Sequence, residues 1–393
     1  MADARPAADG VADEALRIAA WRRLEGLPAG FELGVHPADE MLPGVAEPTS
    51  VPPGRERLVY LRTGLETLVV LEHALAAFGR SLAAPARVLE VACGYGRVTR
   101  HLLQRVEARR LVACEIVPAA VAHVATTFGI ECLHSEADPA RIRWPGRFDL
   151  IVVSSLFSHL PRHRFEHWLA ALRGALADDG LALLSTHGPW MPQAPPDDGR
   201  GFAFHPDSES LTLDGAEYGT TFVAPGEVAR MARAAGYADV RWLERELWAL
   251  QDVFVIGAAP LREARPWRPA PVLDGGIAGS DFGGAPSDAA GAGTRQLWLH
   301  GWVECRDPEQ AVERATLQLD ATPAARLALI APRREQAPPP RPASRFVAEW
   351  RVHEALPADL NGRRTLTLVA EAAGQRRVVD VRTLDLERLR LEG

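Results

Sequence analysis

The stretch Arg87–Leu102, RVLEVACGYGRVTRHL, constrains the fold more than any other part of this chain. It predicts a buried strand, then a tight turn of small residues, then a helix that opens near Arg97. The strand carries a carboxylate, Glu90, and Gly94 and Gly96 allow the backbone to approach a ligand that a Cβ would obstruct. Because a helix start also presents unpaired N–H groups, this turn suits the polar end of a small ligand.

Strands and helices alternate on both sides of that stretch, which is typical of a parallel sheet covered by helices. Helices are expected before it at Val11–Leu24 and Tyr60–Ser81, and after it from Pro118 onward, at 162–177 and at 225–235. We therefore expect an α/β fold, with a Rossmann-like, mostly parallel sheet of seven strands and helices on both faces. The strands expected after the first are Leu111–Ile116, Ile130–His134, Phe148–Val153, Leu181–Ser185, Val240–Leu243 and Val253–Ile256.

The small residues of the turn distinguish two ligand classes. A dinucleotide fingerprint would be G-x-G-x-x-G, and here Thr99 stands where a further glycine would be expected. The order Glu90, Ala92, Gly94, Gly96 instead resembles motif I of class I S-adenosylmethionine (SAM)-dependent methyltransferases, E/D-x-G-x-G-x-G, with alanine in place of the first glycine. A tight turn in another Rossmann-like domain is the alternative.

Later segments sharpen the resemblance. The run FDLIVVSSLFSHLP from Phe148 to Pro161 resembles motif IV and its sequel in a bacterial methyltransferase family. The turn Asp178–Gly180 and the following LALLSTHG at 181–188 are together similar to the L-x-P-G-G-x-L-x-x-T-x-H-G segment of the same family, without its proline. QDVFV at 251–255 resembles a last strand that occurs in methyltransferases found with glycan-assembly enzymes. The resemblance covers residues 58–257.

The resemblance implies that SAM binds at the carboxyl edge of the sheet. Glu115 ends the second strand, where an acid is placed to accept both ribose hydroxyls, although a solvated glutamate is the alternative. Tyr60, Arg62 and Gly64 match the entry to a lid helix near the SAM carboxylate, and an exposed arginine is the alternative reading of Arg62. The other cofactor-binding candidates are Glu90, Ala92, Cys93, Gly94, Gly96, Ile116, Ser135, Glu136, Ala137, Ser154 and Ser155.

Histidines at two strand ends are candidates for the catalytic step. A hydroxyl acceptor must lose a proton, and a histidine of near-neutral pKa suits that role. We expect His159 to be the base or the group that positions the acceptor, followed by His187 and Asp252; a histidine bonded to backbone is the alternative. His163 and His167 are expected to be solvated, so no metal site is predicted.

The composition changes beyond the α/β region. Residues 259–294 are rich in proline and glycine and predict a linker, and after 295 apolar and polar residues alternate as in antiparallel strands. We expect four regions: an N-terminal helical and irregular cap of the methyltransferase (1–84), the methyltransferase domain (85–258), the linker (259–294) and a β-sandwich (295–393). Tryptophans of the sandwich either stack on sugar rings or pack in its core.

The net charge of −7 gives no basic face for nucleic acid. The four cysteines have no paired spacing, the first residues are acidic where a signal peptide would be apolar, and no run is long enough for a membrane span. We therefore expect a cytoplasmic protein, with its oligomeric state open.

The resemblance implies a SAM-dependent methyltransferase, and we expect it to act on a hydroxyl or amine of a small molecule or saccharide. Two alternatives stay open. One is a non-catalytic glycan-binding or scaffold protein with a vestigial nucleotide fold, and the other is an NAD-dependent oxidoreductase.

Overall fold

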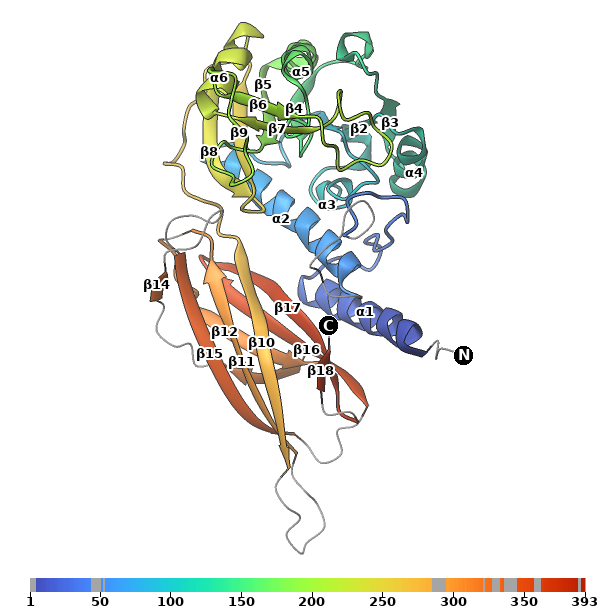
Figure 1. The fold of residues 1–393 in the computed structure, drawn as a ribbon, viewed down its shortest axis with the longest axis vertical. Coiled ribbons are helices and arrows are strands. Elements are labelled where there is room, and N and C mark those ends of the chain that lie inside the picture. Colours follow the sequence, from blue (N-terminus) through green and yellow to red (C-terminus); the bar gives the residue numbers. More distant parts are fainter. Residues whose placement is uncertain are drawn as a thin grey trace, which may run out of the picture.

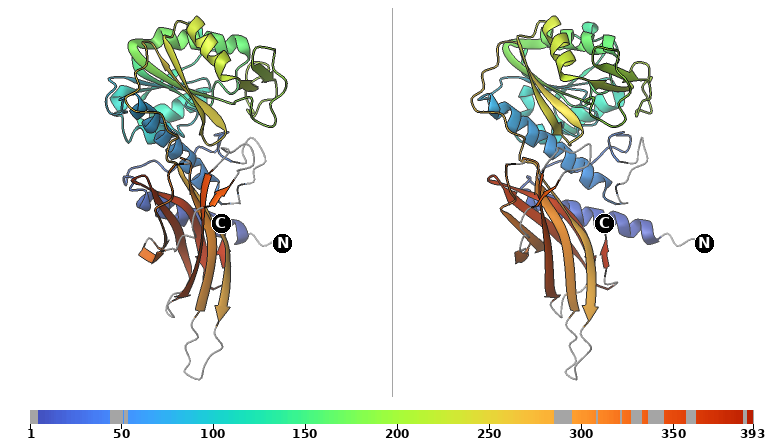
Figure 2. Two further views of the ribbon diagram at one scale, coloured as in Figure 1. Left: turned by 90° about the vertical axis from the view of Figure 1, so that its left-hand side faces the viewer. Right: turned by 60° about the vertical axis from the view of Figure 1, so that its left-hand side comes forward.

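The computed structural model describes residues 5–43, 51, 54–284, 295–307, 309–320, 322–326, 333–335, 345–356, 362–387 and 390–392. Its upper part in Figure 1 is a mixed sheet with helices, and its lower part consists of antiparallel sheets. The long helix α2 lies between the two parts in Figures 1 and 2.

The upper part confirms the predicted seven-stranded sheet. Its strand order is β3-β2-β1-β4-β5-β9-β8; the first five strands run parallel, and β9 is antiparallel to both of its neighbours. Apolar clusters cover both faces of the central strands, as expected for a parallel sheet buried between helices. The strands are β1 (Val88–Val91), β2 (Leu111–Glu115), β3 (Glu131–His134), β4 (Phe148–Val153), β5 (Leu176–Thr186), β8 (Asp239–Leu247) and β9 (Gln251–Gly257).

The helices show ordinary start and stop signals. Pro118 opens α4, and Gly129 ends it with a φ of 63°. The helix expected near Arg97 differs from the prediction, because α3 is one turn from Thr99 to Leu102 and the residues before it form a loop. The helices are α1 (Arg5–Leu24), α2 (Glu56–Ala77), α3 (Thr99–Leu102), α4 (Pro118–Phe128), α5 (Arg162–Ala175) and α6 (Pro225–Ala234), with 3₁₀ turns at Ala108–Arg110 and Pro139–Arg141.

Two short strands lie in the segment between β5 and α6. They are β6 (Phe202–His205) and β7 (Thr220–Val223), which pair antiparallel. The loop that joins them, residues 206–219, is called the 206–219 loop below.

The C-terminal part confirms the antiparallel prediction. Two sheets, β10-β11-β15-β14 and β13-β12-β16-β17-β18, share one apolar core. The predicted linker is shorter than expected, because β10 occupies part of it, and residues 285–294 of that linker lie outside the described residues. The strands are β10 (Leu273–Gly284), β11 (Arg295–Cys305), β12 (Arg314–Leu319), β13 (Thr322–Arg326), β14 (Arg333–Glu335), β15 (Arg345–Leu356), β16 (Arg363–Ala372), β17 (Gln375–Asp385) and β18 (Arg390–Glu392).

The N-terminal helices join the two parts. Trp21 of α1 is buried in a cluster that includes Leu61 of α2 and Val381 of β17. Further along α2, Leu68 and Leu75 lie in the core beneath the seven-stranded sheet. The region expected to cap the α/β domain therefore also packs on the C-terminal sheets, and α2 contributes apolar side chains to both cores.

Candidate active site

A cavity of about 470 Å³ lies at the carboxyl edge of the parallel strands. This is the edge where open α/β sheets bind ligands, and the volume is in the range of small-molecule sites. Its floor consists of the segments that follow β1, β2, β3 and β4, and its roof consists of residues 38–41 and the 206–219 loop. Predicted cofactor residues that line it are Glu90, Ala92, Cys93, Gly94, Glu115, Ile116, Ser135, Glu136, Ala137, Ser154 and Ser155.

The turn after β1 has an unusual backbone. Ala92 adopts a φ of 55° and Gly94 a φ of 54°, and both line the cavity. A Cβ on Gly94 would meet no atom within 4 Å, so its backbone faces open space. Gly96 has a different role from the one expected, since a Cβ there would stand 2.3 Å from the ring of Phe128. Gly94 therefore leaves room for a ligand, whereas Gly96 leaves room for α4.

The carboxylate of β1 is deeply buried. Glu90 is 2% exposed, and the Thr99 hydroxyl donates a hydrogen bond of 2.7 Å to its Oε2. Burial raises the pKa of Glu90 to about 8, outweighing the opposing effect of the hydrogen bond from Thr99. A cationic ligand group beside this carboxyl would favour its ionised form.

The carboxylate at the end of β2 holds two turns together. Glu115 Oε2 accepts from the N–H of Gly94 at 2.8 Å, while Oε1 accepts from Ile116 and Val117 at 2.7 and 3.0 Å. Since a carboxylate has about four acceptor positions, ligand hydroxyls can still be accommodated. Burial raises the pKa of Glu115, and these backbone N–H groups oppose the shift.

The three residues predicted at the lid-helix entry do not line the cavity, and two of them, Tyr60 and Gly64, act on it through neighbours. The hydroxyl of Tyr60 donates to Asp39 at 2.5 Å, and Asp39 lines the cavity. Gly64 allows α2 to pack on the loop after β1, because a Cβ there would stand 2.4 Å from the carbonyl oxygen of Arg97. Arg62 points to the junction with the C-terminal sheets, where its guanidinium lies 3.9 Å from Asp274.

Arg97 is a site residue that the sequence analysis passed over. Its side chain lines the cavity, and its guanidinium lies 4.5 Å from the centre of the Trp248 ring. Burial lowers the pKa of this guanidinium, and Tyr60 and Asp39 oppose the shift. Its place directly after Gly96 was the available signal, but Trp248 comes from a distant segment that no local pattern connects to it.

The predicted catalytic residues lie behind the cavity wall. His159 is 3% exposed and reaches the cavity through Glu209 of the 206–219 loop, whose Oε1 is 3.1 Å from its Nε2. Burial lowers the pKa of His187 to about 4, so this ring is neutral near pH 7. Asp252 accepts hydrogen bonds from the indole N–H of Trp190 at 3.1 Å and the backbone N–H of Arg245 at 2.9 Å.

The comparison with protein families decides what this arrangement is. The family model of the methyltransferase domain matches residues 88–180, which run from the start of β1 into β5 and include both carboxylates of the cavity floor. The chain contains a SAM-dependent methyltransferase domain. No curated protein sequence matches the chain.

Solved structures of low sequence identity are similar to part of this chain. PigF with SAH is 14% identical, with a TM-score of 0.38; the match covers 52% of this chain and 57% of PigF. The Burkholderia thailandensis 1,6-didemethyltoxoflavin-N1-methyltransferase is 20% identical (55% and 93% covered, TM-score 0.36). The glycopeptide N-methyltransferase MtfA complexed with SAM is 18% identical (44% and 82% covered, TM-score 0.33).

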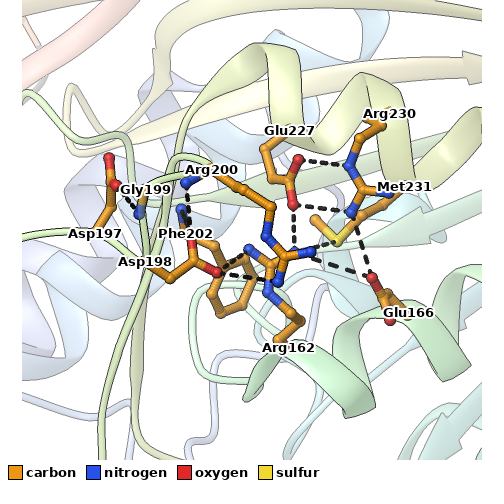
Figure 3. Close-up of polar contacts among 10 residues, drawn as sticks. All are labelled: Arg162, Glu166, Asp197, Asp198, Gly199, Arg200, Phe202, Glu227, Arg230 and Met231. Atoms are coloured by element: carbon orange, nitrogen blue, oxygen red, sulfur yellow. Dashed lines mark hydrogen bonds and ion pairs between the residues drawn. The ribbon is translucent and has the colours of Figure 1, made fainter.

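A group of charged residues anchors the segment that carries the roof of the methyltransferase domain (Figure 3). Arg162, the first residue of α5, forms ion pairs with Glu227 of α6 and with Asp198 of the segment before β6. Arg230 also bonds to Glu227, at 2.7 Å, and the Arg162 guanidinium lies 4.6 Å from the centre of the Phe202 ring. These contacts hold the base of the hairpin from which the 206–219 loop extends.

The two segments of the roof are joined by a hydrogen bond. The backbone N–H of Leu211 donates to Glu40 at 3.0 Å, which joins the 206–219 loop to the segment before α2.

Among the helices in the described part of the chain, none has the length and apolar character needed to cross a membrane.

Proposed function

We propose that the methyltransferase domain transfers the methyl group of SAM to a hydroxyl or amine of a small molecule or saccharide. The observation that carries this proposal is one cavity lined by two chemically different sets of residues. Glu90, Gly94 and Glu115 line it from the edge of the sheet, and Glu209 and Tyr218 line it from the roof. Such a cavity can hold a cofactor and an acceptor together, which is what direct transfer requires.

The residues present fit SAM. The buried Glu90 carboxyl and Asp39 suit its ammonium group, and Arg97, rather than Arg62, suits its carboxylate. Glu115 suits the ribose hydroxyls, and Ser135, Glu136, Ala137, Ser154 and Ser155 are left for the adenine end. When bound, SAM supplies a methyl group on a positively charged sulfur, from which it departs readily.

Four chain segments orient the two reactants. The turns after β1 and β2 are fixed to each other by Glu115, and the roof is fixed at its base by Arg162 and at its tip by Glu40. Correct orientation of the reacting groups can contribute roughly 7–11 kcal/mol to such a reaction. The cavity wall thereby excludes water and holds the acceptor against the cofactor.

Binding experiments test this proposal. Calorimetric titration with SAM is expected to give saturable heat, whereas NADH is expected to give none. A Gly94→Leu variant should lose SAM binding, because the new side chain enters the open space of the cavity. Gly129→Leu is the matched control, since Gly129 has a similar φ of 63° and open surroundings but caps α4. Equal SAM affinity in both variants would contradict the proposal.

We also place the protein in the cytoplasm. All four cysteines are free thiols, and Cys93, Cys114 and Cys305 are buried, as is typical of proteins in a reducing compartment. Separation of soluble and membrane fractions from expressing cells, with blotting for the protein, tests this placement.

A further inference from the structure

Glu209 is one of the charged residues that the roof contributes to the lining of the cavity. It lies in the 206–219 loop, and its side chain is 34% exposed. One carboxylate oxygen contacts His159, and part of the side chain is exposed toward the cavity. No sequence pattern singles it out.

The hydrogen bonds of His159 show how its ring meets the carboxyl group of Glu209. The Nδ1 atom of His159 lies 2.8 Å from the carbonyl oxygen of Gly219, which only accepts, so Nδ1 carries a hydrogen. The Nε2 atom faces Glu209 Oε1 at 3.1 Å, and two bare acceptors at that distance would repel. One proton therefore lies between them. Burial acts to raise the pKa of Glu209, but the hydrogen bond with His159 outweighs it together with the nearby positive charges, so this pKa is lowered.

The surroundings lock this pair in place. The ring of Tyr218 stacks on one face of His159 with centroids 4.6 Å apart, and the backbone of Gly219 holds the edge of the ring through the bond to Nδ1. Because His159 has no lone pair left to accept a proton, the group that can meet an acceptor is the carboxylate of Glu209.

The charges around Glu209 favour a cation. Glu40 and Asp214 of the roof are acids, and Arg164 is engaged by Glu217 at 2.5 Å. Arg97 also acts on Glu209 electrostatically from the floor, where it stacks on Trp248. When Arg97 holds a carboxylate of the cofactor, the acids Glu40 and Asp214 make the potential beside Glu209 negative.

We propose that Glu209 receives the acceptor and that the acceptor is a small molecule carrying a primary or secondary amine, which arrives protonated. This inference rests on the proposed methyl transfer. The ammonium group first binds Glu209 and gives up one proton to it or, through it, to solvent. The nitrogen lone pair then forms the N–C bond while the C–S bond breaks and its electrons stay on sulfur. The product leaves as a methylated ammonium, so charge and protons balance.

A hydroxyl acceptor fits these groups less well. Its proton would need a base much stronger than a carboxylate whose pKa is lowered. His187 cannot replace it, because its buried ring has a pKa of about 4 and lies beside Gln251 at 3.4 Å. An ammonium group needs only to lose one N–H proton to become a nucleophile. A carboxylate can pass that proton on to water.

Radiolabelled methyl transfer with a panel of matched acceptors tests the proposal. The panel contains small amines, including glucosamine and tyramine, each paired with its hydroxyl analogue, such as glucose and 2-(4-hydroxyphenyl)ethanol. Methylation of amines without methylation of their partners is the expected result. Methylation of the hydroxyl compounds, or of no amine although SAM binds, would overturn the amine proposal. Absence of SAM binding would instead refute the proposed methyl transfer.

Variants of the pair identify the role of Glu209. Glu209→Gln should raise the KM for the amine by about tenfold or more, because it removes a charge-assisted hydrogen bond, and should leave the affinity for SAM unchanged. Glu209→Asp should recover part of the loss, and His159→Gln should shift the acidic limb of the pH profile of kcat/KM. Asp207→Asn is the control, since Asp207 lies in the same loop, pairs with His205 and is 87% exposed. Equal KM values for Glu209→Gln and Asp207→Asn would overturn the role of Glu209.

Discussion

The backbone N–H of Gly94 donates a hydrogen bond of 2.8 Å to Oε2 of Glu115. The acid at the end of β2 thereby holds the turn that follows β1, in addition to the backbone of its own turn. Glu115 has two tasks in the proposed site, since it would bind ribose hydroxyls and also fixes the loop that faces them. Binding and local order should therefore change together when it is replaced.

Glu115→Gln should weaken SAM binding roughly tenfold to a hundredfold, because hydrogen bonds to a charged group are each worth about 1.5–3 kcal/mol. Amide hydrogen exchange should also be faster at Gly94 and Ile116. Glu131→Gln is the control, since Glu131 is exposed on neighbouring β3. Calorimetry and exchange measured by mass spectrometry check both effects. A weaker affinity with unchanged exchange would mean that Glu115 contacts the ligand without holding the loop.

Replacing Ala92 by glycine should increase the stability of the protein. Its φ of 55° is in the left-handed region, which costs a residue with a Cβ roughly 1–2 kcal/mol. Glycine loses part of that gain to the greater freedom of the unfolded chain, so Ala92→Gly should stabilise the protein by about 0.5–1 kcal/mol. Urea unfolding measures the difference. Ala137→Gly, at a cavity residue without a positive φ, should be destabilising, and a loss of stability at both positions would contradict the strain at Ala92.

The sequence allowed prediction of those features that depend on local pattern. Apolar runs predict the order of strands and helices. The acids Glu90 and Glu115 are predicted as site residues because each lies on a strand or at its end. Arg97 was missed because its role depends on how α2 and Trp248 pack around it, whereas Arg62 was chosen from a motif although its side chain points to the junction. Glu209 was missed because the segment between β5 and α6 has no regular period.

The packing of the N-terminal region was also beyond sequence reasoning. The apolar residues of α1 predict a buried face but do not say what covers it. In the structure Trp21 packs with Val381 of β17, more than three hundred residues along the chain. The predicted linker extended into β10 because the glycine-rich residues of that strand look irregular in sequence. In the structure they pair with β11.

Glu90 should make cofactor binding depend on pH. In the folded protein its pKa is about 8, compared with an ordinary value of 4.5, so at pH 7 it is mostly protonated. A cationic ligand favours the carboxylate, and SAM binding at pH 7 should release close to one proton per site. Calorimetry in two buffers of different ionisation enthalpy measures this release. It should fade above pH 8, and a release that is absent at pH 7 would contradict the raised pKa.

The same raised pKa should affect stability. Because the unfolded chain loses the Glu90 proton near pH 4.5 and the folded protein holds it until about pH 8, the free energy of unfolding falls as pH rises through that window. Glu90→Gln should remove this dependence and raise the Tm at pH 8 while weakening SAM binding. A Glu90→Gln variant that is less stable than the original protein at pH 8 would show that the ionised carboxylate is well accommodated.

Arg162 should control the order of the roof. Its guanidinium joins α5 to Glu227 of α6 and to Asp198 of the segment before β6 (Figure 3). Arg162→Met keeps most of the side-chain length but leaves Glu227, whose side chain is 3% exposed, with Arg230 as its remaining ion-pair partner among the described residues. We expect a loss of about 1–3 kcal/mol in the free energy of unfolding and faster proteolysis between β5 and α6. Arg200→Met is the control, because Arg200 is 64% exposed and meets Asp198 at 3.6 Å. If the two variants are cleaved at the same rate, the roof is held by its apolar contacts instead, and the acceptor KM should then be unaffected by Arg162→Met.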